Sequence, residues 1–180
     1  MLQEEGLMIP DREECMRMLK ENGVPDNIIA HSKAVAEIAL EYGRKIKANG
    51  EKVNLRLLEA AALLHDVCKH ESLTKGNEEE RDHGAAGARL LEKKDMPEVA
   101  DVVGSHMMDS IFIPGKLDSL EKKLVYYADK LVNPEGRVTW SKRLEYLNRR
   151  YPSAVEKFKR ADPMIRKLEK EIKSAAGVKE

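Results

Sequence analysis

Histidine and aspartate side chains occur at positions of this chain where a helix would bury them. His31 follows Ile28 by three residues and precedes Val35 by four, so a helix places all three on one face. Asp129 lies among apolar residues of another predicted helix. An unpaired buried carboxylate costs several kcal/mol, so such a group needs a cation, a metal ion or several hydrogen bonds.

Six side chains share this placement on the inward faces of predicted helices: His31, His65, Asp66, His83, His106 and Asp129. Each histidine taken singly is more often a core residue satisfied by hydrogen bonds. Taken together, the six can converge in the interior of a helical bundle, where metal sites are common. Imidazole and carboxylate ligands without thiolate favour Fe, Mn, Co, Ni, Zn or Mg in an open site over a closed structural zinc. His70 is expected to be solvated.

The elements that position these side chains are predicted to be helices. Apolar residues recur at helical spacing, and no period-two alternation bounded by hairpin turns is present, so the sequence predicts an all-α fold, a single compact helical bundle over residues 1–180. Capping residues, Pro and Gly predict helices over 11–22, from 26 towards 49–50, from 54 into the polar stretch at 70–82, and over 82–93, 97–106 and 119–131. The stretch 70–82 is expected to be a mobile loop.

The last part of the chain, 139–176, is expected to form two helices broken at Pro152 or Pro163. The final helix carries an apolar stripe. It consists of Phe158, Ala161, Ile165, Leu168 and Ile172. The favoured interpretation is that this stripe docks onto the domain's own core, and a dimer contact is the alternative.

Composition limits the partners of the chain. Lys and Arg total 32, as do Asp and Glu, so no overall positive field attracts polynucleotides or anionic membranes. Cys15 and Cys68 form no CxxC pair, which argues against a disulfide framework or a thiolate zinc site. No run approaches 18 apolar residues. We therefore expect a soluble cytoplasmic protein, monomeric or homodimeric, that binds neither polynucleotide nor membrane.

The order of these histidines and aspartates along the chain resembles the H…HD…D signature of the HD superfamily of metal-dependent phosphohydrolases. His31, then His65-Asp66, then Asp129 carry that signature, and residues 63–69 resemble its LLHD(I/V)xK element. His83 and His106 match the two further histidines of binuclear members. Residues 126–131 are similar to the YxADK segment of small bacterial HD proteins that hydrolyse dinucleoside tetraphosphates symmetrically. The resemblance covers 11–137 as a core and leaves 138–180 as a helical extension.

The resemblance implies two divalent metal ions and hydrolysis of a phosphomonoester or phosphoanhydride, with a nucleotide or dinucleoside polyphosphate as the small substrate. It assigns a first metal to His31, His65, Asp66 and Asp129, and a second to His83 and His106 with Asp66 bridging. A hydroxide shared by two metals would be the nucleophile. Asp66 and Lys69 would be catalytic, and Lys69, Lys130 and Arg137 would contact phosphate.

Two departures concern the substrate. The segment that ends at Arg137 has the sequence VNPEGR, which is longer than the EPGR of the tetraphosphatase subgroup. Met107-Met108-Asp109 occupies the position where that subgroup has small hydroxyl residues.

Two other functions use the same ligands. One is a di-iron oxygenase, and the other is a regulatory module that binds metals and a nucleotide without turnover.

Overall fold

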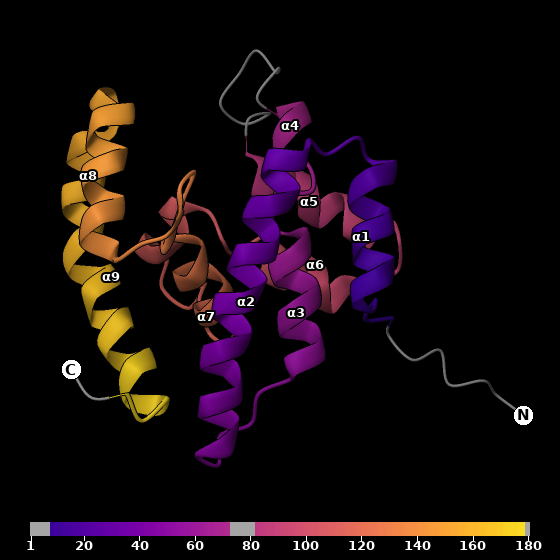
Figure 1. Ribbon diagram of the computed structural model, residues 1–180, viewed down its shortest axis with the longest axis horizontal. Helices are drawn as coiled ribbons and strands as arrows, with labels where there is room; N and C mark the ends of the chain where they lie inside the picture. The colour runs from indigo at the N-terminus through magenta and orange to yellow at the C-terminus, as the bar shows by residue number, and fades with distance from the viewer. Residues whose placement is uncertain (1–7, 73–81, 179–180) are drawn as a thin grey trace, which may run out of the picture.

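The computed structural model describes residues 8–72 and 82–178 of the chain. Helices dominate these residues, in agreement with the predicted all-α class (Figure 1). The elements in chain order are α1 (Arg12–Glu21), α2 (Asp26–Ala48), α3 (Leu55–Leu64), α4 (Lys69–Ser72), α5 (His83–Glu92), α6 (Pro97–Val103), the 3-10 helix η1 (Met108–Phe112), α7 (Leu120–Asp129), β1 (Val132–Asn133), β2 (Gly136–Arg137), α8 (Trp140–Arg150), the 3-10 helix η2 (Pro152–Ala154) and α9 (Val155–Ala175).

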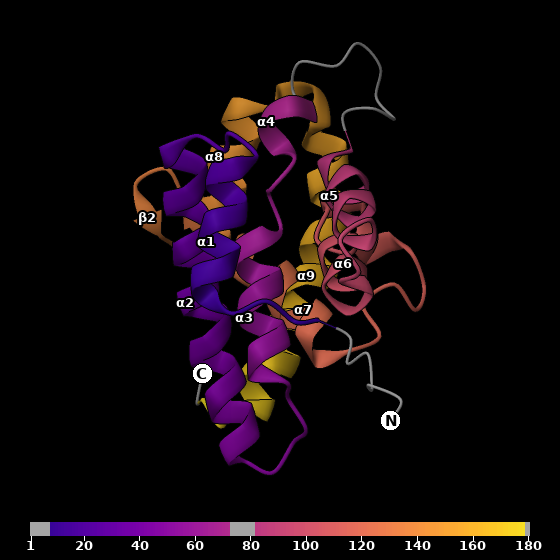
Figure 2. The same cartoon turned by 90° about the vertical axis from the view of Figure 1, so that its right-hand side faces the viewer.

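Helix α3 is the centre of the bundle. Its residues Leu58 and 60–64 are all buried, because α1 and α2 pack on one side of it and α6 packs on the other (Figure 2). Helix α2 also packs against α7, and α5 lies against α6. The site residues that end α3 are therefore surrounded by helices.

Side-chain caps set most of the helix starts at the residues expected from the sequence. Asp11, Asn54, Asp82 and Ser119 each accept a hydrogen bond from a backbone N–H of the first turn. The helix from 26 has Asp26 as its predicted N-cap. This prediction is wrong, because Pro25 occupies that position and its carbonyl accepts the N–H groups of residues 28 and 29. Asp26 instead lies in the first turn, where its carboxylate interacts favourably with the positive end of the helix dipole.

Four predicted boundaries differ from the structure. Helix α3 ends at Leu64 and does not continue into the polar stretch, because a turn over 65–68 separates it from α4. Helix α6 ends at Val103, so His106 lies in the turn beyond it rather than on the helix. Helix α7 ends at Asp129, and Val132–Asn133 pairs antiparallel with Gly136–Arg137 in a short hairpin that the helical periodicity did not predict. Gly136, at a φ of +117°, makes the turn that Pro134 begins. The polar stretch 70–82 begins in α4, and its residues 73–81 lie outside the described residues.

The C-terminal helices pack onto the core through the predicted stripe. Its five residues are all buried, and α9 contacts α2, α7 and η1, which confirms docking onto the chain's own core. The break falls at Pro152, while α9 continues through Pro163 because apolar contacts on both sides of it hold the helix in place. Trp140 ties α8 to α9 by donating to Asp162 Oδ1 at 2.7 Å. In the described residues, no helix is both long and apolar enough to cross a membrane.

Candidate metal centre

The structure brings all six predicted ligand side chains to one place inside the bundle. His31 comes from α2, His65 and Asp66 from the end of α3, and Asp129 from the end of α7. His83 begins α5, and His106 follows α6. The imidazole rings of neighbouring histidines lie with their centroids 5.0–5.3 Å apart, so the cluster is continuous from His31 to His83.

Asp66 lies at the centre of this cluster and divides its two carboxylate oxygens between two groups of histidines. Oδ2 lies 3.7 Å from His31 Nε2 and 3.4 Å from His65 Nε2. Oδ1 lies 3.1 Å from His83 Nε2 and 3.6 Å from His106 Nε2. The two groups that could each hold a metal ion therefore meet at Asp66.

Asp129 belongs to the first of these groups. Its Oδ1 lies 3.0 Å from His31 Nε2 and 3.6 Å from His65 Nε2. Four donors, two imidazole nitrogens and two carboxylate oxygens, thus face one another on that side. On the other side, Asp66 Oδ1 faces the Nε2 atoms of His83 and His106.

Backbone carbonyls orient two of the histidines for metal binding. His65 Nδ1 lies 2.8 Å from the carbonyl oxygen of Ala62, and His106 Nδ1 lies 2.7 Å from that of Val103. A carbonyl can only accept a hydrogen bond, so each Nδ1 carries the proton and each Nε2 is directed into the cluster. This arrangement around a metal-ligating histidine fixes the ring and leaves the ligand nitrogen available.

The buried polar atoms of the cluster fit a metal ion. His65 Nε2, His106 Nε2 and Asp66 Oδ1 are buried and have no hydrogen-bond partner among the described residues. Leaving buried polar atoms unsatisfied is costly, and native proteins rarely do it without a compensating ligand. Nitrogen and carboxylate donors aimed at common points are the donor set that a divalent transition metal takes.

Electrostatic coupling keeps both carboxylates ionised. Burial alone would raise the pKa of Asp66, but the charge of His65, with the neighbouring imidazoles of His106 and His83, holds that pKa well below its usual range. Burial opposes ionisation of Asp129 too, and Lys130 with His31 and His65 lowers its pKa well below the usual range. Both aspartates are therefore available as anionic ligands.

The histidines differ in charge. Burial lowers the pKa of His106 to about 4, so its imidazole is neutral at physiological pH. Burial would also lower the pKa of His65, but Asp66 and Asp129 outweigh it and raise that pKa to about 10. A metal ion that binds His65 Nε2 must displace this proton, which couples metal affinity to pH.

Two lysines contact the aspartates, and they occupy different environments. Lys69 Nζ lies 2.7 Å from Asp66 Oδ2 with its side chain one-third exposed, so it lies where the cluster meets solvent. Lys130 is buried, and its Nζ lies 2.6 Å from Asp129 Oδ2 and 3.0 Å from the carbonyl oxygen of His106. The prediction that Lys130 contacts substrate is not supported by this position. Lys130 instead holds Asp129 and the His106 turn in place.

Removing the Lys130 ammonium should destabilise the metal-free protein. Lys130→Met leaves Asp129 buried without its closest cation, and breaking a buried pair in this way costs about 3 kcal/mol or more of unfolding free energy. Urea unfolding in the presence of chelator measures this loss. Lys122→Met is the matched control, because Lys122 is also buried but pairs with exposed carboxylates of Asp101 and Asp118, and its loss should cost about 1 kcal/mol or less. Equal losses in the two variants would contradict the role given to Lys130.

Arg137 also lies elsewhere than expected. Its guanidinium pairs with Glu41 at 2.6 Å with its side chain half exposed, and it is not among the residues that line the cavity beside the metal centre. The structure thus gives no support to a substrate contact by Arg137.

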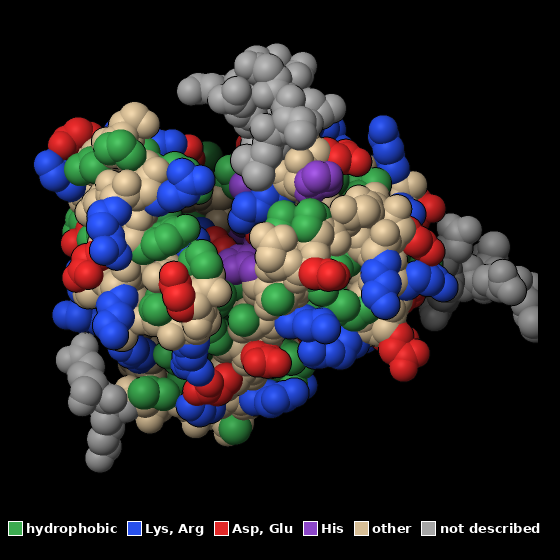
Figure 3. Space-filling model, turned by 45° about the horizontal axis from the view of Figure 1, so that its top comes forward, with side chains coloured by type: hydrophobic (Ala, Val, Ile, Leu, Met, Phe, Trp, Pro, Cys, Tyr) green, Lys and Arg blue, Asp and Glu red, His purple; other side chains and the backbone are tan. Residues whose placement is uncertain are grey.

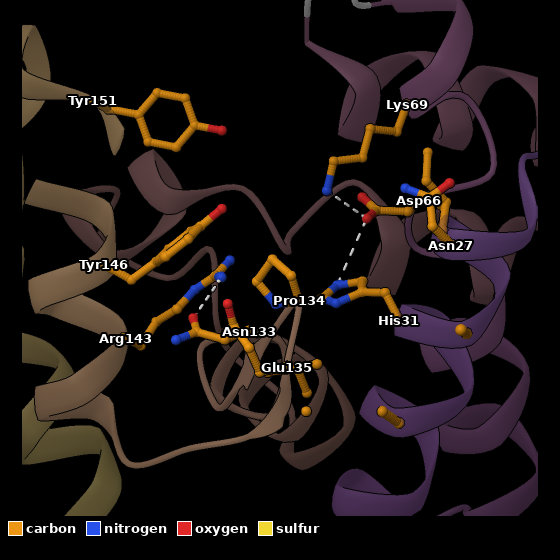
Figure 4. A pocket seen from close by; sticks show the side chains of 15 residues that line it. Asn27, His31, Asp66, Lys69, Asn133, Pro134, Glu135, Arg143, Tyr146 and Tyr151 are labelled. Atoms are coloured by element: carbon orange, nitrogen blue, oxygen red, sulfur yellow. Dashed lines mark hydrogen bonds and ion pairs between the residues drawn. The ribbon is translucent and has the colours of Figure 1, made fainter. Parts of the chain in front are cut away.

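A cavity of about 570 Å³ opens beside the metal centre, between the core helices and α8. Figure 3 shows histidine side chains at the bottom of a hollow on this face. His31, Asp66 and Lys69 stand on one wall, while Arg143, Tyr146 and Tyr151 stand on the other (Figure 4). The hairpin residues 132–136 line the cavity between the walls.

The sequence interpretation missed the three residues of the second wall. Arg143 and Tyr146 are three residues apart on α8, so an aromatic residue paired with a cation on one helix face was visible in the sequence. That pair alone is typical of an ordinary helix surface, because nothing in the local sequence shows which helix face meets a cavity. Which face of α8 lines the cavity is decided by the packing of α8 against α9 and of α9 against the core.

Comparisons with known proteins agree with this site. The family model for the HD domain matches residues 28–133. An uncharacterised protein from Methanocaldococcus jannaschii, MJ0778, is 30% identical over 70% of this chain and 78% of its own length. No solved structure matches.

Two other similar proteins carry a different name. A tRNA (cytidine(56)-2′-O)-methyltransferase from Picrophilus torridus is 28% identical over 94% of this chain, and one from Thermoplasma volcanium is 26% identical over 73% of it. The chain spans only 48% and 39% of these two relatives. The HD-domain match covers more than half of the chain and includes all six cluster residues in their expected order. This chain therefore belongs to the HD-domain family.

Proposed function

We propose that the protein is a metal-dependent phosphohydrolase that cleaves a phosphomonoester or phosphoanhydride of a small nucleotide. The observation that carries the proposal is the position of Asp66, whose two oxygens face two separate groups of histidines. A carboxylate placed in this way is suited to bridge two metal ions. Bound divalent ions would supply activated water and stabilise the charge of a phosphoryl group during in-line displacement.

The protein's own residues supply the two metal sites and the charge for an anionic substrate. His31, His65, Asp66 and Asp129 would hold one metal ion, and His83 and His106 would hold the second together with Asp66. Asp66 and Asp129 are balanced by Lys69 and Lys130, so bound divalent cations would leave the site positively charged. A positive, partly enclosed site favours phosphate over neutral substrates.

Lys69 is the residue of this chain best placed to contact the reacting phosphoryl group. It lines the cavity and touches Asp66, so its ammonium lies between the cluster and the space a substrate can enter. Burial lowers the pKa of Lys69, but Asp66 and Asp129 outweigh it and raise that pKa above its usual value. The ammonium is therefore charged at neutral pH and can stabilise negative charge that develops on a phosphate oxygen.

The named relatives guide the choice of substrates to test. Their tRNA-modifying activity is that of proteins about twice as long as this chain or longer, so methyl transfer does not enter the proposal. The tRNA-modifying activity of these relatives does favour nucleotides that arise from RNA as substrates to test. The neutral overall charge of the chain argues for small nucleotides rather than intact polynucleotides.

The test is a panel of substrates assayed for phosphate or nucleotide release with Mn, Co, Ni, Fe, Zn and Mg. The panel contains nucleoside 2′-, 3′- and 5′-phosphates, 2′,3′-cyclic phosphates, dinucleoside tetraphosphates and sugar phosphates. We expect metal-dependent turnover of at least one nucleotide class. No turnover with any metal would contradict the proposal, and substrate-dependent oxygen uptake by iron-loaded protein without phosphate release would assign an oxygenase instead.

The two halves of the cluster should lose metal separately. His106→Ala removes a donor that faces only Asp66 Oδ1, so metal content should fall from two ions per chain towards one. His83→Ala should act in the same way. Elemental analysis of protein purified without chelator measures the ratio, and His70→Ala serves as a histidine control because His70 is exposed on α4. Two ions retained in both variants would show that the second site is wrongly assigned.

A further inference from the structure

One wall of the cavity comes from a part of the chain that lies outside the match to the HD domain. Arg143, Tyr146 and Tyr151, which together we call the α8 wall, follow residue 133, where that match ends. Figure 4 shows them across the open space from Lys69 and His31. Residues that belong to the chain's own extension, rather than to the shared domain, are well placed to select its substrate.

Arg143 has hydrogen-bonding capacity that the protein does not use. Its Nη1 donates to Asn133 Oδ1 on the hairpin at 3.0 Å, which fixes the guanidinium beside the cavity. Its Nε is buried and has no partner among the described residues. A guanidinium carries five N–H donors in a rigid fork that matches a phosphate. Arg143 lines the cavity, and a guanidinium that is held there through one of its donors favours an anionic ligand on the donors that remain.

The two tyrosines add aromatic rings to the same wall (Figure 4). The Arg143 guanidinium lies 5.4 Å from the centroid of the Tyr146 ring, which orders that ring from one side. Tyr151 keeps 47% of its surface exposed, an unusual fraction for a large aromatic side chain at the edge of a cavity. Exposed aromatic rings bind nucleobases by stacking, because every base presents a π face.

The size of the cavity agrees with a ligand that reaches both walls. Its volume of about 570 Å³ lies within the range of roughly 300–1,000 Å³ that is usual for small-molecule sites. An inorganic phosphate at the metal centre would leave the tyrosines without a contact. A nucleotide can place phosphate beside Lys69 and its base against the opposite wall.

We propose that the α8 wall binds the nucleotide substrate, with Arg143 on a phosphate oxygen and Tyr146 and Tyr151 on the base. This assignment rests on the proposed function for the identity of the reacting group. Binding itself does not depend on turnover, so it can be measured separately.

The test uses the metal-loaded full chain and two probes that resist hydrolysis at their P–C–P linkage, α,β-methylene-ADP and methylenediphosphonate. Calorimetry gives the affinity for each. Tyr146→Leu should weaken binding of α,β-methylene-ADP roughly tenfold, in line with the loss of one base-stacking contact, and leave methylenediphosphonate unchanged. Tyr146→Phe should restore the affinity, and Tyr151→Leu should act like Tyr146→Leu to a smaller extent. Arg143→Gln should weaken both probes.

Arg149→Gln is the control, since Arg149 is exposed on α8 and does not line the cavity. Metal content must be equal in all variants. Loss of nucleoside-specific binding in Tyr146→Leu supports the proposal even if no substrate is turned over. Two results would contradict the proposal: Tyr146→Leu binds α,β-methylene-ADP like the wild type, or the wild type does not bind it at all. If a nucleotide is turned over in either case, the hydrolase function stands but the α8 wall does not select the substrate.

Discussion

Asp66→Asn should remove both metal ions and abolish activity. The amide keeps the shape of the carboxylate but loses the charge and one of the two oxygens that face the two histidine groups. Metal catalysis supplies several kcal/mol of transition-state stabilisation, so kcat/KM should fall by about a thousandfold or more. Elemental analysis and kinetics with the best substrate of the panel measure the two effects.

Asp101→Asn is the matched control for this substitution. The Asp101 side chain is exposed on α6 and pairs with Lys122, not with a histidine of the cluster, so its loss should change neither metal content nor activity. His31→Ala separates the two sites further, because His31 faces Asp129 and Asp66 Oδ2 only. Retention of two metal ions in Asp66→Asn would contradict the bridging role of this carboxylate.

Lys69→Met should reduce turnover without changing metal content. An ammonium has no lone pair for a metal, so the ligands remain, while the charge beside the phosphoryl group is lost. The loss of one electrostatic donor should reduce transition-state stabilisation, as measured by kcat/KM, by about 2–4 kcal/mol. The stability of the metal-loaded protein should barely change, because bound metal ions would balance the charge of Asp66 in place of the ammonium.

The control for this prediction is Lys33→Met, since Lys33 is exposed on α2 and does not line the cavity. Kinetics at matched metal loading compare the two variants. Turnover of Lys69→Met within a few-fold of the control would remove Lys69 from the reaction and leave it as the partner of Asp66 in the metal-free protein.

Local sequence rules placed most of the helices because the determinants are themselves local. A capping carboxylate or amide such as Asp11, Asn54 or Asp82 acts within one turn, so type and position are enough to mark a helix start. The hairpin after α7 escaped prediction because two residues per strand are too few to show a period of two. The path of α9 through Pro163 also escaped, since contacts with the core maintain that helix.

The sequence by itself determined which side chains could form the metal centre. Six His and Asp residues on apolar faces have few satisfactory environments, and their order along the chain resembles that of the HD family. Only the tertiary structure decided how Asp66 divides its oxygens and that Lys130 is buried while Arg137 pairs at the surface. It also decided that Arg143 and Tyr146 line the same cavity as His31 and Asp66. These features depend on how α8 and the hairpin pack against distant helices, and periodicity within one element carries no information about packing between elements.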